Sequence, residues 1–313
     1  MLRCHGLTAL TLTALALTLA LAPPAFARTL EVGAGKPYAQ PSQAIAAAQD
    51  GDRILIADGE YFDCAVVRQN NLTIEGASEQ GAVLTDKACQ GKALLVTVGS
   101  NITVRNLTLT RARVPDGNGA GIRAEGNGLL IDRVSFVNNQ DGILAANQPN
   151  GTITIRDSAF VRNGACDQAC AHGVYVGQLK LLRIENTTFR ETRRAHDIKS
   201  RALRTEVVNC DFADGPTGTA SYAIDIPNGG SLLATGNRFE KGPKAENHTA
   251  VIMIGEEGVS QPTREIVVEN NTVRADGDYP TVFVFNQTAT EAALRNNHLS
   301  GHITALHGDG SAG

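Results

Sequence analysis

A short pattern of apolar and polar positions recurs along the chain. An aliphatic residue is followed two positions later by Asn or Asp, and three positions beyond that by a large apolar residue, as in segments 155–160, 184–189 and 207–212. A period mostly in the twenties predicts a stack of similar units rather than one globular core. The closing apolar residues are Leu109, Phe136, Phe160, Phe189, Phe212, Phe239, Val273 and Leu299.

Each unit is predicted to contain two short strands. The first leads into the Asn/Asp turn, in segments 72–75, 102–105, 129–131, 153–155, 181–184, 206–208, 266–268 and 292–294. The second lies in segments 121–124, 142–145, 173–176, 197–200, 223–226, 251–254 and 282–285. Short strands at this period, with no helices between them, predict parallel sheets wound into a coil.

The turn positions form a column of their own. Asn and Asp side chains favour turns and can hydrogen-bond to one another and to the backbone from one unit to the next. Arg133 and Gly236 interrupt this column. Its other members are Asn106, Asp157, Asn186, Asn209, Asn270 and Asn296.

The N-terminal part of the chain differs from the repeats. Arg3, the apolar run 7–22 and the small residues Ala25 and Ala27 predict a secretory signal over residues 1–27. The Ala-rich segment 41–49, with Ser42 as its expected cap, is predicted to form a helix that covers the open end of the coil. We therefore expect one domain over residues 28–313, with repeats from about residue 72 to 305.

The remaining sequence predicts an exported protein, either secreted or periplasmic. No later segment approaches the roughly 20 consecutive apolar residues of a membrane span. In an oxidising compartment we expect the disulfides Cys64–Cys89 and Cys166–Cys170. Cys210 occupies the repeat position held by Ser158 and Thr187 and is predicted to be a packed thiol.

The charge pattern bears on the possible partners. The formal net charge is −4, and the basic residues form no long tract, which argues against a nucleic acid or an anionic membrane surface. The chain has no Trp and only 4% aromatic residues, so few side chains are available for stacking on bases or sugars. We expect a monomer.

These features together resemble a known family. The repeat period, the Asn/Asp column, the Phe column and the helix that precedes Gly51-Asp52-Arg53-Ile54-Leu55-Ile56 are similar to right-handed parallel β-helix proteins of the pectate-lyase-like superfamily, over roughly residues 30–305. The resemblance implies an all-β, single-stranded, right-handed parallel β-helix with an N-terminal capping helix. It does not fix an activity, because this fold hosts lyases, hydrolases, epimerases and binding proteins.

The repeats also predict which side chains share a face. If Ile198 points into the core, alternation along the strand places Asp197, Lys199 and Arg201 on the outside. Lys199 then belongs to the column Arg123, Leu144, Tyr175, Lys199, Asp225, Met253 and Val284. A second column, two residues before the core aliphatic, contains His172, His196 and Tyr222. Both columns are most polar in the same three units, which predicts one groove.

The residue types in this groove suit chemistry on a uronic-acid polymer. Abstraction of the C5 proton beside a carboxylate needs a positive group, a base and an acid. We expect Arg or a bound cation as the positive group, Lys or His as the base, and Tyr175 or Tyr222 as the acid. The family resemblance implies the same reaction class, and we interpret the protein as a polysaccharide lyase or C5-epimerase for an acidic glycan. The expected catalytic residues are Lys199, Arg201, His196, His172, Tyr175 and Tyr222, and the expected substrate-binding residues are Arg123, Asp197 and Asp225. Arg201 is expected to lower the pKa of Lys199, with Asp197 and Asp225 opposing it.

Other functions stay open at this point. Asp197 and Asp225, on consecutive units, are compatible with a glycoside hydrolase. A non-catalytic carbohydrate-binding or cell-envelope structural protein is a further alternative. No cofactor or metal ligand is expected; a catalytic calcium stays an alternative without support, since the chain has no cluster of Asp at calcium-binding spacing. Glu256 and Glu257 are interpreted as solvated charges, with an extension of the groove as the alternative.

Overall fold

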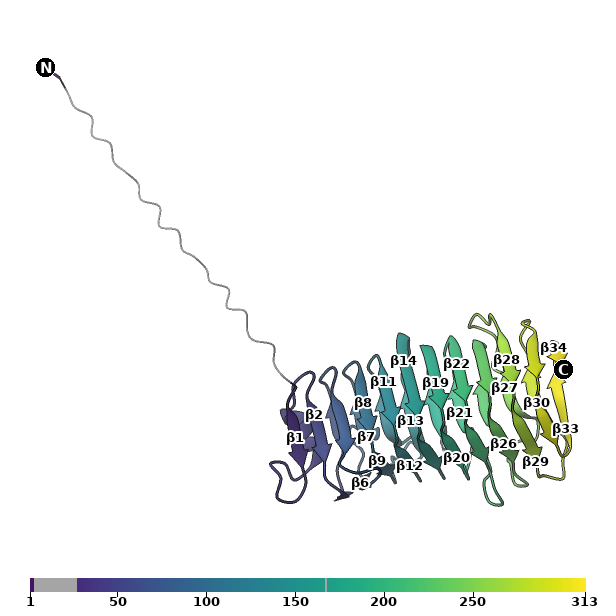
Figure 1. Cartoon of the computed structure of the whole chain (residues 1–313), viewed down its shortest axis with the longest axis horizontal. Coiled ribbons are helices and arrows are strands. Elements are labelled where there is room, and N and C mark those ends of the chain that lie inside the picture. The colour runs from purple at the N-terminus through teal and green to yellow at the C-terminus, as the bar shows by residue number, and fades with distance from the viewer. Residues whose placement is uncertain (3–26, 167) are drawn as a thin grey trace.

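The computed structural model describes residues 1–2, 27–166 and 168–313. Most of the predicted signal segment therefore lies outside the described residues. From residue 27 onward the chain winds into a solenoid whose strands stack along its long axis (Figure 1). Each turn passes through three parallel sheets instead of the two predicted strands, because the apolar residue after the Asn/Asp turn forms a strand of its own.

Sheet 1 contains all the predicted strands that lead into the Asn/Asp turn. Its 12 strands are, in spatial order, β1 (Thr29–Val32), β2 (Arg53–Ile56), β5 (Thr73–Gly76), β8 (Ile102–Arg105), β11 (Leu129–Asp132), β14 (Gln148–Arg156), β19 (Leu179–Glu185), β22 (Arg204–Val208), β25 (Ser231–Thr235), β28 (Ile266–Glu269), β31 (Ala292–Arg295) and β34 (Gly310–Ala312). All neighbouring strands are parallel, as the sequence predicts.

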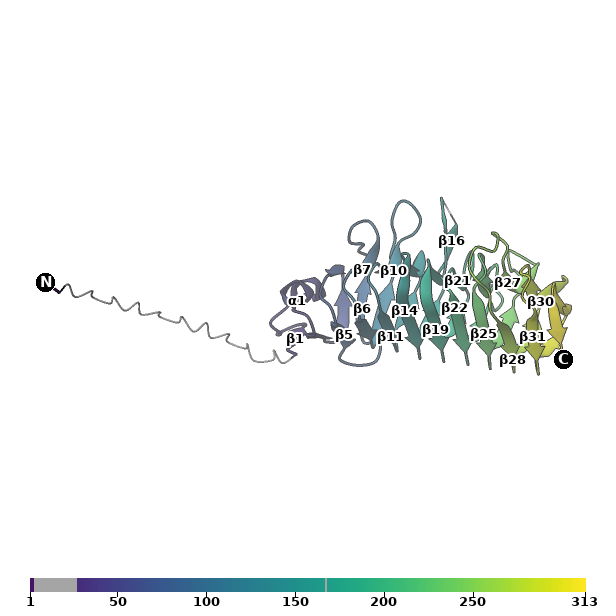
Figure 2. The same cartoon turned by 90° about the horizontal axis from the view of Figure 1, so that it is seen from above.

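Sheet 2 contains all the predicted second strands. Its 10 strands are, in spatial order, β33 (Ile303–His307), β30 (Thr281–Asn286), β27 (Ala250–Ile254), β24 (Ile224–Ile226), β21 (Ile198–Ser200), β18 (Val174–Val176), β13 (Asp141–Ala145), β10 (Ala120–Ala124), β7 (Ala93–Thr97) and β4 (Ala65–Val67). Loops near β7, β10, β16 (Ala165–Cys166) and β27 rise on one side of the molecule (Figure 2).

Sheet 3 carries the Phe column. Its 10 strands are, in spatial order, β3 (Gly59–Tyr61), β6 (Ala82–Thr85), β9 (Leu107–Thr110), β12 (Ser135–Val137), β15 (Ala159–Val161), β20 (Thr188–Arg190), β23 (Asp211–Ala213), β26 (Arg238–Lys241), β29 (Thr272–Ala275) and β32 (His298–Ser300). A two-stranded hairpin, β16 with β17 (Cys170–Ala171), projects from the solenoid.

The Asn/Asp column marks a left-handed backbone position between sheets 1 and 3. Asn106, Asn186 and Asn209 have φ values of 57°, 49° and 53°, and Arg133 and Gly236 have values of 54° and 69°. This conformation costs most residues about 1–2 kcal/mol and is tolerated best by Gly, Asn and Asp, which explains the composition of the column. Some of the predicted contacts between units are present: the Asn186 side chain donates to Asp157 at 3.2 Å.

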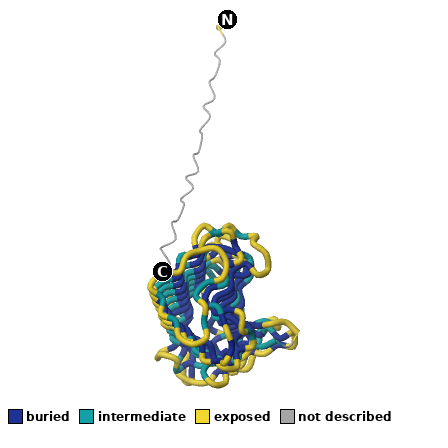
Figure 3. Tube along the Cα trace, turned by 90° about the vertical axis from the view of Figure 1, so that its right-hand side faces the viewer, coloured by how far each residue is buried: buried dark blue, intermediate teal, exposed yellow. Residues whose placement is uncertain are grey.

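The core between the sheets is dominated by the stacked Phe column. The rings of Phe136, Phe160, Phe189, Phe212 and Phe239 lie nearly parallel, with centroids 4.6–4.9 Å apart, which is the spacing of the strands that carry them. All these rings are buried. Seen along the solenoid, the buried strands enclose the interior and the exposed residues lie in the loops at the corners (Figure 3).

The predicted helix is present but shorter than expected. Helix α1 (Pro41–Ala47) buries Ala44 and Ile45 at the N-terminal end of the core. Ser42 is not its cap, because Gln40 takes the N-cap position and the Gln43 side chain accepts the Gln40 N–H at 3.2 Å. The backbone N–H of Ser42 donates to Asp63 instead, at 2.7 Å. Among the described residues, no helix is long and apolar enough to cross a bilayer.

The cysteine predictions are confirmed. Disulfides join Cys64 to Cys89 and Cys166 to Cys170, the second of these closing the projecting hairpin. Cys210 is buried, with its thiol 3.4 Å from the carbonyl oxygen of Val208.

Burial makes the thiol of Cys210 unreactive. Burial raises the pKa of Cys210 to about 12, and the thiolate is the reactive form. We expect the folded protein at about pH 8 to leave Cys210 unmodified by a thiol reagent for hours, whereas the unfolded chain reacts within minutes. Mass spectrometry of the labelled protein measures this difference, and rapid labelling of the folded protein would contradict the burial of this side chain.

Candidate active site

The two predicted polar columns meet on the outer face of sheet 2. In register across β18, β21 and β24, Tyr175 lies beside Lys199 and Lys199 beside Asp225. In the second column, the rings of His172 and His196 stack at 4.9 Å, and those of His196 and Tyr222 also stack at 4.9 Å. The structure thus brings these six side chains together as the sequence predicted.

Lys199 lies at the centre of the cluster between two carboxylates. Its Nζ is 3.0 Å from Asp225 Oδ2 and 2.7 Å from Glu257 Oε1. Only 10% of the Lys199 side chain is exposed, Asp225 is fully buried, and 40% of the Glu257 side chain is exposed. Glu257 is therefore the member of this trio that faces solvent.

Arg201 extends the same cluster along β21. Its guanidinium lies 2.7 Å from Glu257 Oε2, so that Glu257 bridges Lys199 and Arg201. Arg201 Nε donates to Tyr175 Oη at 3.1 Å, and Arg201 Nη1 donates to the side-chain oxygen of Asn228. The result is a pair of cations beside a phenolic oxygen, with one carboxylate placed across both cations.

The charge state of Lys199 differs from the prediction. Burial by itself would lower the pKa of Lys199, but the charges of Asp225 and Glu257 and their hydrogen bonds outweigh burial and raise the pKa above its usual value. The predicted lowering by Arg201 is wrong, because Glu257 lies between the two cations and offsets their repulsion. Lys199 is thus a protonated cation at neutral pH.

Asp225 is the buried counter-charge of this cluster. Burial raises the pKa of Asp225 to about 7, and the proximity of Lys199 only partly offsets this effect. Its second close neighbour is His196, whose Nε2 lies 3.4 Å from Asp225 Oδ2. Because Asp225 has no exposed surface, it acts on the groove through Lys199 and not by direct contact with a ligand.

The backbone fixes the tautomers of the two histidines. His172 Nδ1 accepts the N–H of His196, and His196 Nδ1 accepts the N–H of Tyr222, both at 3.2 Å. A backbone N–H can only donate, so the proton of each neutral ring lies on Nε2. Burial is the main cause that lowers the pKa of His172 well below its usual value and that of His196 to about 3. Neither ring therefore has a free lone pair with which to act as a base.

This assignment can be checked directly by NMR. A lowered pKa means that each ring stays neutral as the pH falls through the usual His range near 6.5. We expect the ¹⁵N shifts of His172 and His196 to report the Nε2–H tautomer and to stay constant from about pH 8 to about pH 5. Exposed His298 serves as the internal control. Titration of either buried ring near pH 6.5 would contradict the assignment.

The Nε2–H tautomer of His196 argues against a metal ion at the one group of potential metal ligands found among the described residues. Ligand atoms of His196, Asp225 and Glu256 all lie within 4.8 Å of one another. The histidine atom that faces Asp225 is Nε2, which carries the proton and so offers no lone pair to an ion. Glu256 has a different partner, since its carboxylate accepts the hydroxyl of Tyr222 at 3.0 Å.

Asp197 does not belong to the groove, contrary to the prediction. It precedes β21 in a bend, where strand alternation does not apply, and it continues the column of Gly121, Gly142 and Gly173. A side chain in this column points inward: a Cβ on Gly142 would lie 2.7 Å from the ring of Phe160. The Asp197 carboxylate accepts the hydroxyl of Thr192 at 2.5 Å.

The neighbours of Asp197 form a separate buried cluster. Asp197 lines a small internal pocket together with Asp214 and Lys241. Burial is the main cause that raises the pKa of Asp197 to about 8. Asp197 therefore takes no part in the chemistry of the groove.

Of the other members of the predicted outer column, Arg123 lies at the edge of the cluster and Val284 lies outside the column. Arg123 is in register with Leu144, which separates it from Tyr175 by one strand, and it pairs with Glu125 at 3.5 Å. The placement of Val284 in the outer column is wrong. Phe285 pairs with Met253 there, whereas Val284 pairs with Ile252 in the core.

The sequence interpretation considered the acidic loop after β27 only as an alternative extension of the groove. Glu257 contacts both cations, and Glu256 contacts Tyr222, whose hydroxyl also accepts from Asn247 at 2.8 Å. Both acids are exposed, as their interpretation as solvated charges expects, and their contacts with Lys199, Arg201 and Tyr222 also fit the alternative, an extension of the groove. The sequence does indicate that this loop borders the groove, because two adjacent acids lie between Gly255 and Gly258, directly after a strand of the same sheet.

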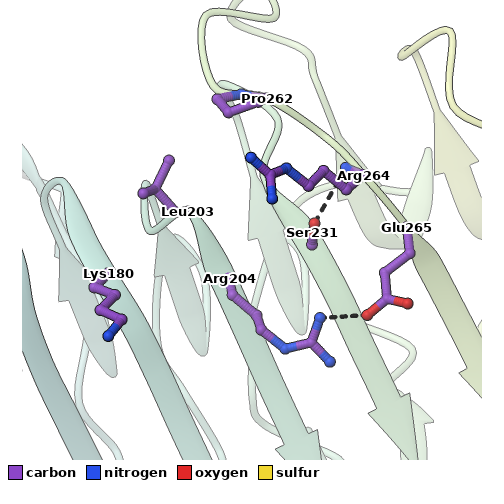
Figure 4. A pocket seen from close by; sticks show the side chains of 7 residues that line it. All are labelled: Lys180, Leu203, Arg204, Ser231, Pro262, Arg264 and Glu265. Atoms are coloured by element: carbon purple, nitrogen blue, oxygen red, sulfur yellow. Dashed lines mark hydrogen bonds and ion pairs between the residues drawn. The ribbon is translucent and has the colours of Figure 1, made fainter.

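A larger pocket lies around the corner from this cluster, on sheet 1. It has a volume of about 470 Å³, and Leu203, which lines it, follows Arg201 by two residues (Figure 4). Arg204 points toward Glu265 across this pocket, and the backbone of Arg264 donates to Ser231 at 3.1 Å. None of the predicted site residues lines it. The full lining is Lys180, Leu203, Arg204, Ser231, Pro262, Arg264 and Glu265.

The fold and the sequence place the chain in a family. A family model described as "Right handed beta helix region" matches residues 153–312, just over half of the chain. The chain therefore belongs to this family, and the predicted right-handed parallel β-helix is confirmed. No curated protein sequence matches the chain.

Proteins of known structure with the same fold include enzymes that catalyse different reactions. The alginate lyase from Paenibacillus sp. str. FPU-7 has 18% sequence identity and a TM-score of 0.65, over 89% of this chain and 99% of its own. Pectate lyase Pel9A has 16% identity and a TM-score of 0.63, over 92% and 79%. The pectin methylesterase from carrot has 13% identity and a TM-score of 0.51, over 91% and 85%. At these identities the likeness concerns the fold, so the reaction has to be argued from the site.

Proposed function

We propose that the protein is an exported polysaccharide lyase that cleaves a uronate-containing glycan by β-elimination. This proposal rests on the carboxylate of Glu257, which lies between Lys199 and Arg201 and beside the hydroxyl of Tyr175. A site that holds one carboxylate across two cations suits the carboxylate of a uronate, which must be neutralised before its C5 proton can be removed. The alginate and pectate lyases of the same fold support this substrate class.

We propose a role for each group from its contacts. Arg201 binds the uronate carboxylate and stabilises the negative charge that develops on it. Tyr175 is the base, because the Arg201 N–H aimed at its oxygen stabilises negative charge there. Lys199 is the acid, since its carboxylate neighbours keep it protonated. His172 positions the Tyr175 ring, with ring centroids 5.1 Å apart, and His196 orients Asp225.

The elimination balances with these groups. Ionised Tyr175 takes the C5 proton, and the C5–H electron pair forms the double bond between C4 and C5. The bond between C4 and O4 breaks, and O4 leaves with the preceding sugar and takes a proton from Lys199. Tyr222 is proposed to hold Glu256 at the edge of the groove, and Arg123, two strands from Tyr175 or about 10 Å away, to contact a more distant uronate.

The alternative reactions fit this geometry less well. A hydrolase needs two carboxylates that both face the substrate, but Asp197 faces an internal pocket and Asp225 is buried beneath Lys199. An epimerase would begin with the same proton abstraction and return a proton to C5 from the opposite face. The basic and acidic groups described here, Tyr175 and Lys199, lie on adjacent strands of one face.

A screen of the purified protein tests the proposal. Alginate, pectate and related uronans are incubated with it, and ultraviolet absorbance reports the unsaturated ends. We expect at least one uronan to give this absorbance. The absence of unsaturated ends with every uronan would remove the lyase proposal, and C5 inversion detected by NMR without cleavage would replace it with the epimerase reading.

A further inference from the structure

One carboxylate of the protein already occupies the position that the proposed function needs for its substrate. Glu257 Oε1 lies 2.7 Å from Lys199 and Oε2 lies 2.7 Å from Arg201. Each oxygen of one carboxylate thus satisfies one cation, which is the arrangement that a bound uronate would adopt.

Glu257 also lies on the solvent side of both cations. Its side chain is 40% exposed, against 10% for Lys199 and 22% for Arg201. Asp225, the other carboxylate on Lys199, lies on the buried side. A ligand that approaches from solvent therefore meets Glu257 before it meets either cation.

The backbone that carries Glu257 is held in place by hydrogen bonds that do not involve its side chain. The N–H of Glu257 donates to Pro227 at 2.9 Å, and Gly258 N–H closes the loop onto Gly255 at 3.0 Å. The next segment is fixed as well, because the N–H groups of Ser260 and Gln261 both donate to Asn228. Rotation of the Glu257 side chain toward solvent breaks none of these bonds, so the exchange requires no movement of the loop.

We propose that Glu257 is an internal stand-in for the substrate carboxylate, which leaves Lys199 and Arg201 only when another carboxylate replaces it. This inference rests on the proposed function for the identity of the ligand, a uronate. It adds a residue that every ligand must displace, at a cost in free energy that only an anionic ligand recovers from the two cations.

The physical reason for the selectivity is the cost of unpaired charge. When a uronate replaces Glu257, each cation exchanges one ion pair for another, and the released glutamate is solvated. When a neutral or esterified sugar replaces it, two partly buried cations lose a charged partner and gain none, which is strongly unfavourable. Glu257 therefore weakens the binding of every ligand by the same free energy of displacement, and only a ligand that brings its own carboxylate recovers that free energy from the two cations.

The exchange leaves the charges around Lys199 nearly unchanged. Tyr175 and Asp225 face Lys199 from the neighbouring strands, Glu257 from the acidic loop, and His196 and Arg201 from its own segment of the chain. A uronate that takes the place of Glu257 supplies the same negative charge, so Lys199 remains protonated and can still act as the acid.

The test measures binding without turnover. Galacturonate, with galactose as its uncharged counterpart, is titrated into the wild-type protein and into Glu257→Gln, and binding is followed by NMR of the labelled protein. We expect Glu257→Gln to bind galacturonate at least about tenfold more tightly than the wild type, because the internal competitor is gone. Galactose should bind neither protein.

Glu265→Gln is the matched control. Glu265 belongs to the same connection between β27 and β28, but it pairs with Arg204 on sheet 1 and not with the two cations of the groove. We expect Glu265→Gln to bind galacturonate as the wild type does. Thermal unfolding of both variants verifies that they fold.

The outcomes separate this inference from the proposed function. Unchanged or weaker binding of galacturonate by folded Glu257→Gln would overturn the inference, even if the protein cleaves a uronan. Tighter binding that shows the expected preference for galacturonate would support it, even if no uronan yields unsaturated ends and the lyase proposal fails.

Discussion

Replacement of Lys199 with Ala is expected to lower the rate of uronan cleavage by about 10²–10⁴-fold, the usual contribution of a positioned acid or base. Lys199 is the one lysine in contact with both Asp225 and Glu257 in the described part of the chain, and its proton is the one assigned to the leaving oxygen. The initial rate of absorbance increase with the active uronan measures the effect.

Loss of folding has to be separated from loss of chemistry in this experiment. Without Lys199, the buried carboxylate of Asp225 loses its closest cation, although its pKa of about 7 allows it to take up a proton instead. Lys199→Arg keeps the positive charge but cannot readily release a proton. We expect this variant to unfold near the wild-type temperature and still to be at least about 100-fold less active.

Lys180→Ala is the control for this experiment. Lys180→Ala removes an exposed lysine on sheet 1 and should leave cleavage unchanged. If the folded variants Lys199→Ala and His196→Ala both cleave the uronan at the wild-type rate, the candidate site is wrong and the groove has to be sought elsewhere on the solenoid.

Replacement of Phe189 with Ala is expected to reduce the free energy of unfolding by about 3–5 kcal/mol. Phe189 lies in the middle of the stacked column, with Phe160 and Phe212 at 4.9 Å and 4.8 Å, and 1% of it is exposed. Removal of the ring leaves a cavity with no solvent access and takes a stacking partner from both neighbours. Urea unfolding followed by circular dichroism measures the change.

Phe62→Ala provides the matched comparison. Its ring is 58% exposed, so the same truncation should cost less than about 1 kcal/mol. A similar, small loss for Phe189→Ala would mean that the stack does not carry the stability of the central turns. In a solenoid the effect is also expected to be local, since each turn packs only against its neighbours.

Much of the fold could be predicted because it is repetitive. The Asn/Asp column follows from a left-handed backbone position that these residues tolerate. This position recurs at every turn from Asn106 to Asn296, with Arg133 and Gly236 in place of Asn or Asp at two of them. The Phe column follows from the strand spacing, which places equivalent side chains directly above one another. Once these two columns are aligned, the register of Tyr175 with Lys199 and of Lys199 with Asp225 is determined.

The errors arose where the local pattern departs from the repeat. Asp197 was placed outside by alternation, but it occupies a bend and a column whose earlier members are glycines, so its side chain faces the interior. Val284 was displaced by one position from the outer column, where Phe285 pairs with Met253. Sequence alternation gives a direction only within a regular strand in a known register.

The sequence by itself determined the β-helix, its two disulfides, the buried thiol and the alignment of Tyr175, Lys199 and Asp225 on one face. Only the tertiary structure decided the protonation state of Lys199, because Glu257 lies 58 residues beyond it in the sequence and contacts it from a separate loop. It likewise decided the histidine tautomers, which depend on backbone N–H groups of the next turn. Repeats encode position, whereas pKa and hydrogen bonding depend on every group that the fold brings near.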